Sequence, residues 1–254
     1  MAGPVAQRQD TERLAQLIRE ADSVVALTGA GISVPSGIPD FRSPGTGLWE
    51  KVDPMEVAHI DVFRRDPVRF WSFYGARFAS LRDKQPNGAH DALVELESRG
   101  LLDAVVTQNI DMLHHRAGTR ELIEVHGTIA HASCLECEAS YELDDVRARL
   151  AADGEVPRCD CGAVLKPDVV LFGEMLPAGA MERATELVID ADVLLCVGSS
   201  LEVYPVAGLP AVTRSCGGAV AIVTQGPTPF DDAAEIKLEG DVVSELQGLL
   251  TAIG

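Results

Sequence analysis

The fold is decided by the stretch Val24-Val-Ala-Leu-Thr28, which is followed directly by Gly29-Ala-Gly31. These five residues carry no charge, and three of them are β-branched. An apolar run of this length that ends at a glycine is typical of a strand buried on both faces of a parallel sheet. Similar runs occur at residues 102–106, 193–197 and 219–223. The chain therefore repeats the strand signal of a parallel sheet.

Helical patterns separate several of these strands. Residues 14–21 place their apolar side chains on one stripe, and residues 90–99 and 181–190 are helix-like. Short apolar strands that alternate with helices are typical of an α/β fold. We therefore predict a doubly wound, Rossmann-like parallel sheet.

Two stretches interrupt the alternation and predict a second, smaller domain. Residues 43–86 are rich in aromatic side chains and are expected to form a loop followed by helices, whereas residues 132–167 contain four cysteines. We expect residues 43–88 and 132–167 to pack together as the small domain, part helical and part zinc-binding. The large, nucleotide-binding domain would then comprise residues 1–42, 89–131 and 168–254.

The four cysteines form two close pairs, Cys134-Leu-Glu-Cys137 and Cys159-Asp-Cys161. Two such pairs separated by a polar stretch have the spacing that closes four thiolates around one Zn²⁺. A full thiolate set leaves no open position, so the metal would hold a small module together and would not activate water. A thioredoxin-type redox pair is the alternative, which the second pair disfavours. His131 is a rival for one of the four ligand positions.

The composition excludes some classes of function. The formal charge of −18 argues against nucleic acid as the main partner. An acidic surface attracts basic protein segments, or simply keeps the protein soluble, and the second account is the simpler. We see no secretory signal and no membrane span, and the remaining cysteines, Cys196 and Cys216, fit a reducing compartment. A cytoplasmic protein without nucleic-acid or membrane partners is expected.

The turn after the first strand is placed like a dinucleotide-binding turn. Its third glycine is absent, because Val34 takes that place, and two glycines also fit any tight turn. The residues that follow, through Ser43, contain two prolines and a further glycine. They cannot continue as a regular helix, so we expect a loop shaped for more than a pyrophosphate.

A set of further motifs follows in a fixed order. They are Gly29-Ala-Gly-Ile-Ser33, Gly37-Ile-Pro-Asp-Phe-Arg42, Thr107-Gln-Asn-Ile-Asp111, His126-Gly127, the four cysteines, Phe172-Gly-Glu174 and Gly198-Ser-Ser-Leu-Glu-Val203. Each motif alone is modest, but the ordered set covers nearly the whole chain and resembles the sirtuins, the NAD-dependent protein deacylases. The resemblance implies an NAD-binding domain and a small domain with a structural zinc, with NAD and an acyl-lysine peptide meeting between them.

In the sirtuins the acyl oxygen attacks the nicotinamide ribose, which releases nicotinamide and leaves an alkylamidate. A histidine then deprotonates a ribose hydroxyl, and the acyl group leaves as 2'-O-acyl-ADP-ribose. The resemblance assigns this general base to His126, and an imidazole suits the task because its ordinary pKa lies near neutrality. From the residues alone, His114 and His115 remain rivals on a helix expected after Asp111.

The resemblance also implies which residues hold NAD. Gln108 and Asn109 would position the ribose as part of the catalytic set, and Ile110 and Asp111 would hold the nicotinamide carboxamide. A carboxylate suits that place because it accepts the amide N–H donors, although Asp111 also fits a helix N-cap. The other implied cofactor residues are Gly29, Ala30, Gly31, Ser33, Asp40, Phe41, Arg42, Gly198, Ser199, Ser200, Thr224 and Val242.

Two of these assignments have alternatives. Phe41, on a loop expected to be mobile, would shield the reactive ribose from water, and a phenylalanine there also fits a buried loop anchor. Thr224 stands where many sirtuins place an asparagine for the adenine ribose. Its hydroxyl can still make one hydrogen bond.

Tyr74 and Arg77 are three residues apart in a helical pattern and therefore lie on one face. A phenol beside a guanidinium forms a site for a carboxylate, which the guanidinium can bind through two hydrogen bonds. On spacing alone, the pair more readily fits a boundary aromatic beside a solvated charge. The order Tyr-x-x-Arg resembles the sirtuin subgroup that removes succinyl and malonyl groups, and Ala58 falls where that subgroup keeps a small residue.

The resemblance thus implies an enzyme that removes acetyl and also succinyl or malonyl groups from protein lysines. Its implied substrate residues are Ala58, Tyr74, Arg77, Phe172, Gly173, Glu174, Val203 and Tyr204. One alternative is a protein mono-ADP-ribosyltransferase that uses the same cleft. The other is a non-catalytic NAD-sensing, protein-binding module, which the presence of both Asn109 and His126 disfavours.

Overall fold

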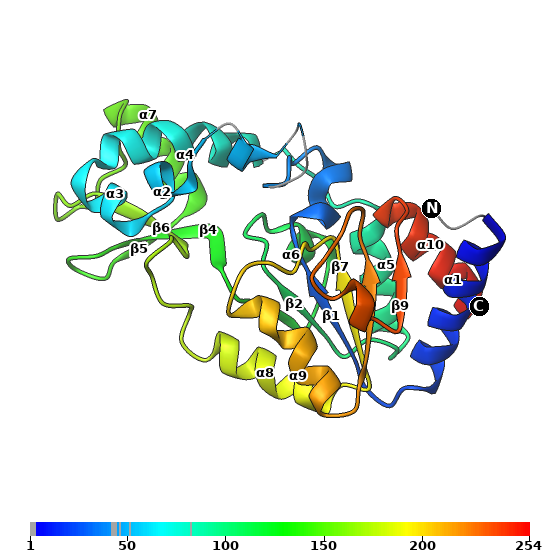
Figure 1. The fold of residues 1–254 in the computed structure, drawn as a ribbon. Coiled ribbons are helices and arrows are strands. Elements are labelled where there is room, and N and C mark those ends of the chain that lie inside the picture. Colours follow the sequence, from blue (N-terminus) through cyan, green and yellow to red (C-terminus); the bar gives the residue numbers. More distant parts are fainter. Residues whose placement is uncertain (1–3, 42–44, 46, 51, 82) are drawn as a thin grey trace.

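The computed structural model describes residues 4–41, 45, 47–50, 52–81 and 83–254, without the side chains of residues 4–7 and 76–79. A six-stranded sheet and a three-stranded sheet occupy separate lobes (Figure 1). The larger sheet has the order β3-β2-β1-β7-β8-β9, and all of its pairings are parallel. This arrangement confirms the predicted fold class of a doubly wound parallel sheet with a smaller second domain.

The strand first recognised in the sequence, β1 (Val24–Thr28), lies at the centre of this sheet. It pairs on one side with β2 (Ala104–Thr107) and on the other with β7 (Val193–Val197). All five of its residues are buried, as its apolar composition predicts. The outer strands are β3 (Leu122–Glu124), β8 (Ala219–Val223) and β9 (Ile236–Leu238).

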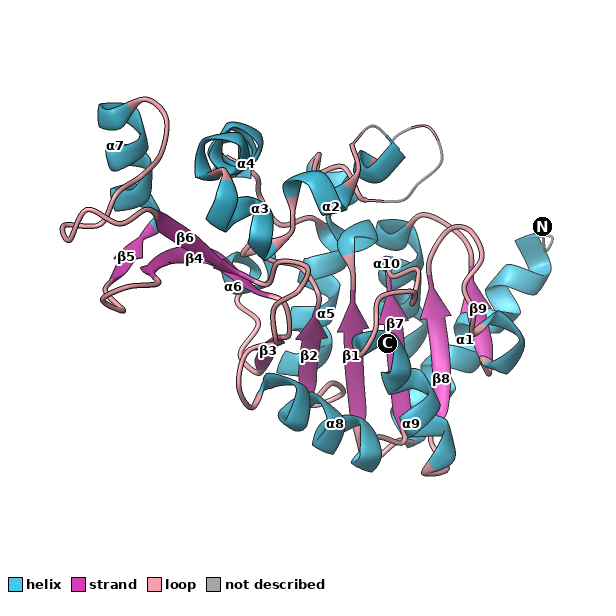
Figure 2. Ribbon diagram, turned by 60° about the vertical axis from the view of Figure 1, so that its left-hand side comes forward, coloured by secondary structure: helices cyan, strands magenta, loops and turns pink. Residues whose placement is uncertain are grey.

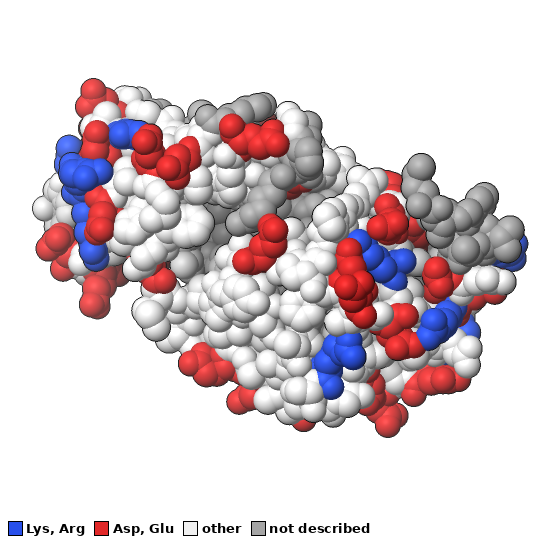
Figure 3. Space-filling model, viewed as in Figure 1, with Lys and Arg blue, Asp and Glu red and all other residues white. Residues whose placement is uncertain are grey.

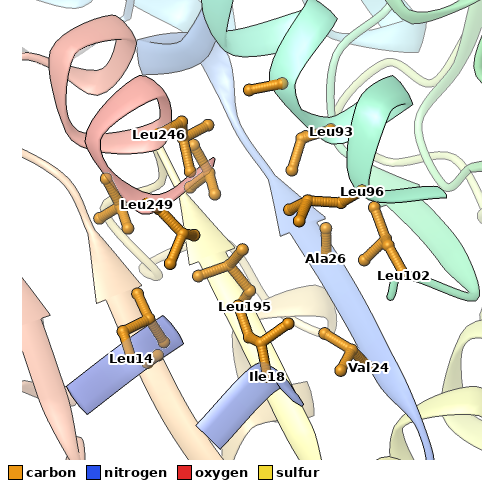
Figure 4. Packing of buried hydrophobic residues seen from close by; sticks show 14 of the residues in the cluster. Leu14, Ile18, Val24, Ala26, Leu93, Leu96, Leu102, Leu195, Leu246 and Leu249 are labelled. Atoms are coloured by element: carbon orange, nitrogen blue, oxygen red, sulfur yellow. The ribbon is translucent and has the colours of Figure 1, made fainter. Parts of the chain in front are cut away.

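Helices cover both faces of this sheet (Figure 2). Because side chains alternate along a strand, Val24 and Ala26 face one apolar cluster while Val25 and Leu27 face the other. The first cluster is closed by α1 (Pro4–Glu20), α5 (Gly88–Ser98) and α10 (Val242–Ile253), which Figure 4 shows packing leucines against the strands. The second is closed by α8 (Ala180–Asp190) and α9 (Leu209–Ser215).

The small domain combines two separate parts of the chain. The first supplies α2 (Pro54–Val57), α3 (Ile60–Arg65) and α4 (Pro67–Leu81). The second supplies an antiparallel sheet of β4 (Gly127–Cys134), β5 (Ser140–Glu142) and β6 (Leu165–Val169), with α7 (Leu143–Asp153) beside it. The buried indole of Trp71 donates to the carbonyl of Leu165 at 3.0 Å and so joins the two parts.

Several elements differ from the sequence pattern or extend it. The small sheet extends beyond the predicted domain limits of residues 132–167, because β4 already begins at Gly127 and β6 continues to Val169. Residues 30–36 form a 3₁₀ helix that ends at the left-handed Gly37, where a loop was expected. The short helix α6 (Leu113–Ala117) follows β2. No helix among the described residues has the length and apolar character needed to cross a bilayer.

Candidate active site between the two domains

A cleft of about 1240 Å³ lies where the carboxyl ends of the parallel strands face the small domain. Figure 3 shows the surface hollowed between the two lobes. Its floor comes from the segments after β1, β2, β7 and β8, where ligands bind in open α/β sheets. The neighbours β1 and β7 lie where the strand order reverses, so the cleft is at the topological switch point.

Two glycine turns touch at the floor of the cleft. The amide of Gly31 donates to the carbonyl of Gly198 at 2.8 Å. A Cβ on Gly31 would lie 2.7 Å from that carbonyl oxygen, and a Cβ on Gly198, which has φ +62°, would lie 2.2 Å from the nitrogen of Ile32. Neither turn can therefore accept a larger residue without moving the other. Together they form a backbone-lined surface that suits a pyrophosphate.

Buried polar contacts fix Asn109 and Asp111. Ser33 donates to Asp111 Oδ2 at 2.6 Å, and the Asn109 amide nitrogen donates to the carbonyl of Gly29 at 3.1 Å and to Ser33 Oγ at 3.2 Å. The other oxygen of Asp111 accepts the backbone N–H of Leu113 at 2.9 Å. The N-cap of α6 is Met112 and not Asp111, which the capping alternative had placed there; Asp111 lies one residue earlier, accepts the N–H of the first helical residue and also lines the cleft.

His126 lies at the junction of the two domains, directly before β4. Its Nδ1 is 3.1 Å from the carbonyl oxygen of Gln108, which can only accept, so Nδ1 carries the proton and Nε2 is left as a proton acceptor. Burial lowers the pKa of His126, against the raising effect of the hydrogen bond to Gln108. The carbonyl of His126 accepts the amide of Val170 at 2.9 Å. The imidazole is therefore neutral and oriented, as a general base requires.

The two rival histidines lie outside the cleft lining. The Nε2 of His114 is 2.9 Å from Thr28 Oγ1, which donates to Thr107 Oγ1 at 2.8 Å; Thr107 in turn accepts the backbone N–H of Asn109. Burial, with smaller contributions from His90 and His115, lowers the pKa of His114 to about 3. His114 is thus a neutral structural residue beneath the Asn109 turn. His115 is exposed on the surface, with its Nε2 3.2 Å from Glu124.

The opposite wall combines residues 170–175 with the small domain. Phe172 donates to the carbonyl of Ala58 at 2.9 Å and accepts from the amide of Ile60 at 3.0 Å. Glu174 accepts the amide of Leu171 and forms an ion pair with the buried Lys166 at 3.0 Å. Phe172, Met175 and Tyr204 leave large apolar surfaces exposed beside the cleft. This wall is apolar at its rim and fixed at its base.

The residues predicted to contact the acyl group lie on the same side of the cleft. Ala58 is buried and lines the cleft. Tyr74 also lines the cleft, and its ring stacks on that of Phe70, with 4.6 Å between the ring centres. Arg77 follows in α4, but its side chain lies outside the described atoms, and Arg42 lies outside the described residues altogether. Among the described lining residues, Lys84 is the single lysine or arginine, against five acidic side chains.

Most of the remaining predicted residues also line the cleft. They are Gly29, Ala30, Ser33, Asp40, Phe41, Gln108, Ile110, Gly173, Ser199, Ser200, Val203 and Thr224. Val242 is not brought there: its side chain is buried in the apolar cluster under α10. Two further lining residues, Trp49 and Lys84, were not predicted from the sequence. The ring of Trp49 stacks on that of Phe41, with 5.1 Å between the ring centres. The aromatic composition of residues 43–86 was the available signal for Trp49.

The four cysteines of the small domain converge on one point. Their sulfur atoms all lie within 4.8 Å of one another, and none forms a disulfide. A hydrogen bond from Tyr141 lowers the pKa of Cys159 to about 6. His131 is not in the group, since its Nδ1 faces Glu142 at 3.6 Å. A set of four thiolates fits tetrahedral Zn²⁺ and leaves no position open for water, so the cluster is suited to a structural metal.

The fold and the cleft define a two-domain α/β protein with a dinucleotide site at a sheet switch point and a tetrathiolate metal module. The chain belongs to the Sir2 family, whose profile, described as "Sir2 family", matches residues 29–205.

Similar proteins extend over nearly the whole chain. An "NAD-dependent protein deacetylase" of Sulfolobus acidocaldarius is 42% identical and aligns over 95% of this chain and 97% of its own. "NAD-dependent protein deacylase 1" of Archaeoglobus fulgidus is 41% identical over 92% and 96% of the two chains. A solved Sir2 variant, bound to a deacetylated p53 peptide and 3'-O-acetyl ADP ribose, matches with a TM-score of 0.91 and 42% identity over 95% and 97%.

Proposed function

We propose that this protein is an NAD-dependent protein-lysine deacylase that releases nicotinamide and 2'-O-acyl-ADP-ribose. The observation that carries the proposal is the placement of His126. Its free Nε2 belongs to a neutral imidazole whose Nδ1 donates to the Gln108 carbonyl on the cofactor side, and the backbone carbonyl of His126 accepts the amide of Val170 on the substrate side. A base in this position serves a reaction in which a nucleotide and an acyl-lysine meet.

Each wall of the cleft has a separate task in this proposal. When bound, NAD supplies an electrophilic ribose carbon with nicotinamide as the leaving group. Asn109 orients the ribose, Asp111 accepts the carboxamide N–H groups, and the touching turns at Gly31 and Gly198 hold the pyrophosphate. The His126 imidazole accepts the ribose hydroxyl proton. Phe41 and Trp49 exclude water from this end.

The substrate is an acyl-lysine in a protein segment. Residues 170–175 and Tyr204 bind the chain, and the small side chain of Ala58 leaves room for the acyl group. We include succinyl and malonyl groups besides acetyl, because the phenol of Tyr74 lines the cleft one helical turn before Arg77. The five acidic lining residues oppose a carboxylate, so the basic residue beside Tyr74 decides whether such groups are accepted.

A peptide panel tests the proposal. Acetyl-, succinyl- and malonyl-lysine versions of one peptide are incubated with the protein, with and without NAD. The products are identified by their masses in a mass spectrometer. We expect loss of the acyl mass only with NAD, together with acyl-ADP-ribose. A gain of the mass of ADP-ribose on the peptide would instead identify the protein as an ADP-ribosyltransferase. NAD binding without either change would leave a sensing module.

We further propose a cytoplasmic location and no nucleic-acid or membrane partner. The support is the charge of −18, which repels nucleic-acid phosphates and anionic lipids, and four thiols that require reducing conditions. Cell fractionation with an antibody would test the location. Recovery in the membrane pellet after a high-salt wash would contradict it.

A further inference from the structure

The second pair of cysteines is held by residues from two neighbouring elements. The phenol oxygen of Tyr141, on β5, is 3.3 Å from Cys159 Sγ and accepts the backbone N–H of Asp160 at 3.2 Å. A zinc-bound cysteine sulfur carries no hydrogen. The single phenol hydrogen must therefore point to the sulfur, so Tyr141 donates to Cys159.

Arg149, on α7, closes the arrangement from outside. Its guanidinium carbon lies 4.3 Å from the centre of the Tyr141 ring, within the range of a cation–π contact. The same side chain donates to the carbonyl of Arg158 at 2.7 Å and pairs with Asp160 at 2.8 Å. The cation lies against the ring and so helps to fix its position. The backbone before Cys159 and the side chain after it are thus tied to α7.

The two cysteine pairs have similar turns and differ in the side chains around them. Both turns are closed by their own backbone: the amide of Cys134 bonds to Ala139 at 2.9 Å and that of Glu138 to Cys134 at 3.0 Å, and the amide of Cys159 bonds to Ala163 at 2.8 Å and that of Gly162 to Cys159 at 2.9 Å. Among the described residues, Cys159 is the one member of the cluster whose sulfur is bonded by the side chain of a residue other than cysteine, whereas Cys137 and Cys161 accept the backbone N–H groups of Ala139 and Ala163. Cys137 and Cys161 are exposed to solvent, whereas Cys134 and Cys159 are buried. A chelator therefore meets the exposed sulfurs first, and the hold on Cys159 limits further opening.

We propose that Tyr141 and Arg149 form an outer shell that retains the structural Zn²⁺ of this protein by fixing the Cys159 thiolate. Loss of an outer-shell partner typically changes metal affinity by about 10–100-fold. The inference concerns the zinc module alone and does not depend on the reaction in the cleft.

Zinc release to a chromogenic chelator, 4-(2-pyridylazo)resorcinol, tests this directly in the full-length protein. Tyr141→Phe keeps the ring and its contact with Arg149 but removes the hydroxyl, and we expect release at least about tenfold faster. Arg149→Met should also accelerate release, by a smaller factor. Asp144→Asn, an exposed change on the same helix, is the matched control and should release zinc at the wild-type rate.

The outcomes separate cleanly. Because both residues act on one sulfur, the double variant should release zinc more slowly than the product of the two single factors. Purification of Tyr141→Phe with less than one zinc per chain and an unchanged circular dichroism spectrum would be the extreme form of the expected result. An unchanged rate in Tyr141→Phe overturns the proposal, as does wild-type protein that contains no zinc.

Discussion

The two domains are stabilised in different ways. The large domain buries apolar clusters on both faces of a parallel sheet, and its central strand is fully buried. The small domain has one cluster, and two of the cysteines, Cys134 and Cys159, belong to it. The large domain can therefore fold on apolar burial, whereas the small domain has a cluster of four thiols that reaches into its core and is expected to depend on the metal that they would bind.

This difference divides the site. Gly31, Asn109 and Asp111 follow buried strands and are fixed by backbone and buried polar contacts. Ala58 and Phe172 are fixed to one another, and their position depends on the small domain. The cofactor side is thus preorganised by the sheet, while we expect the substrate side to depend on bound zinc. His126 is bonded to both sides.

Removal of the metal should have the largest effect. Chelation, or Cys159→Ala, is expected to unfold the small domain and abolish deacylation, because the thiolates form part of its core. Hydrogen exchange followed by mass spectrometry should show lost protection in β4, β6 and α7, with β1 and β7 still protected. Full activity in Cys159→Ala, or equal loss of protection in both sheets, would contradict the comparison.

His126→Tyr removes the base that joins the two sides. Deacylation should fall by about 10²–10⁴-fold, the range typical of a general base, while NAD still binds. Because burial lowers the pKa of His126, wild-type turnover should persist at pH values below the ordinary histidine range. His115→Gln, at an exposed position outside the cleft, serves as the control. Turnover of His126→Tyr within a few fold of wild type would mean that another residue is the base.

His114 tests whether the cofactor side is a self-contained unit. Its pKa of about 3, against 6.5 when unfolded, means that the folded state binds fewer protons below pH 6.5. The contribution of His114 to the free energy of unfolding is therefore fully present above pH 6.5. It is lost as the pH falls, by about 2 kcal/mol between pH 7 and pH 5.

His114→Gln can still donate to Thr28 but takes up no proton. The variant should lose less stability than wild type between pH 7 and pH 5. The measurement is unfolding in urea, followed by the amide hydrogen exchange of β1. Variant His115→Gln, which removes only the smallest of the three causes that lower the pKa of His114, should keep most of the wild-type dependence. If His114→Gln and wild type show the same pH dependence, His114 is not held neutral by burial.

Arg77→Met tests the substrate side with the smallest expected effect. A charge-assisted hydrogen bond contributes about 1.5–3 kcal/mol, so turnover of succinyl-lysine should fall at least roughly tenfold. Acetyl-lysine has no carboxylate, and its turnover should change little. Arg69→Met on the same helix, where Arg69 pairs with Glu56, is the control. Equal losses of turnover on both substrates would mean that Arg77 has a structural role and would contradict the desuccinylase hypothesis.

The same division explains how far the sequence could be read. Residues 24–28, 193–197 and 219–223 match β1, β7 and β8 residue for residue, because buried parallel strands have a strong local signal. The three-residue strands β3 and β9 are too short to show a period and depend on their neighbours. The motifs located the cleft because they follow strand ends.

Contacts between side chains that no regular spacing relates could not be predicted in the same way. The stacking of Trp49 on Phe41 and the link from His114 through Thr28 to Thr107 join residues whose spacing follows no local pattern. Val242 illustrates the converse, since the resemblance implied a cofactor contact and its side chain lies in the core. The metal module was readable because cysteine pairs have a spacing of their own.

The most direct test of the account is the stoichiometry of one reaction. Wild-type protein is given NAD and an acetyl-lysine peptide, and nicotinamide, free lysine peptide and acetyl-ADP-ribose are counted by mass spectrometry in the same samples. If the cofactor side and the substrate side act on one another through His126, the three products should appear in equal amounts at all times. Free lysine without nicotinamide, or nicotinamide with ADP-ribose attached to the peptide, would contradict it.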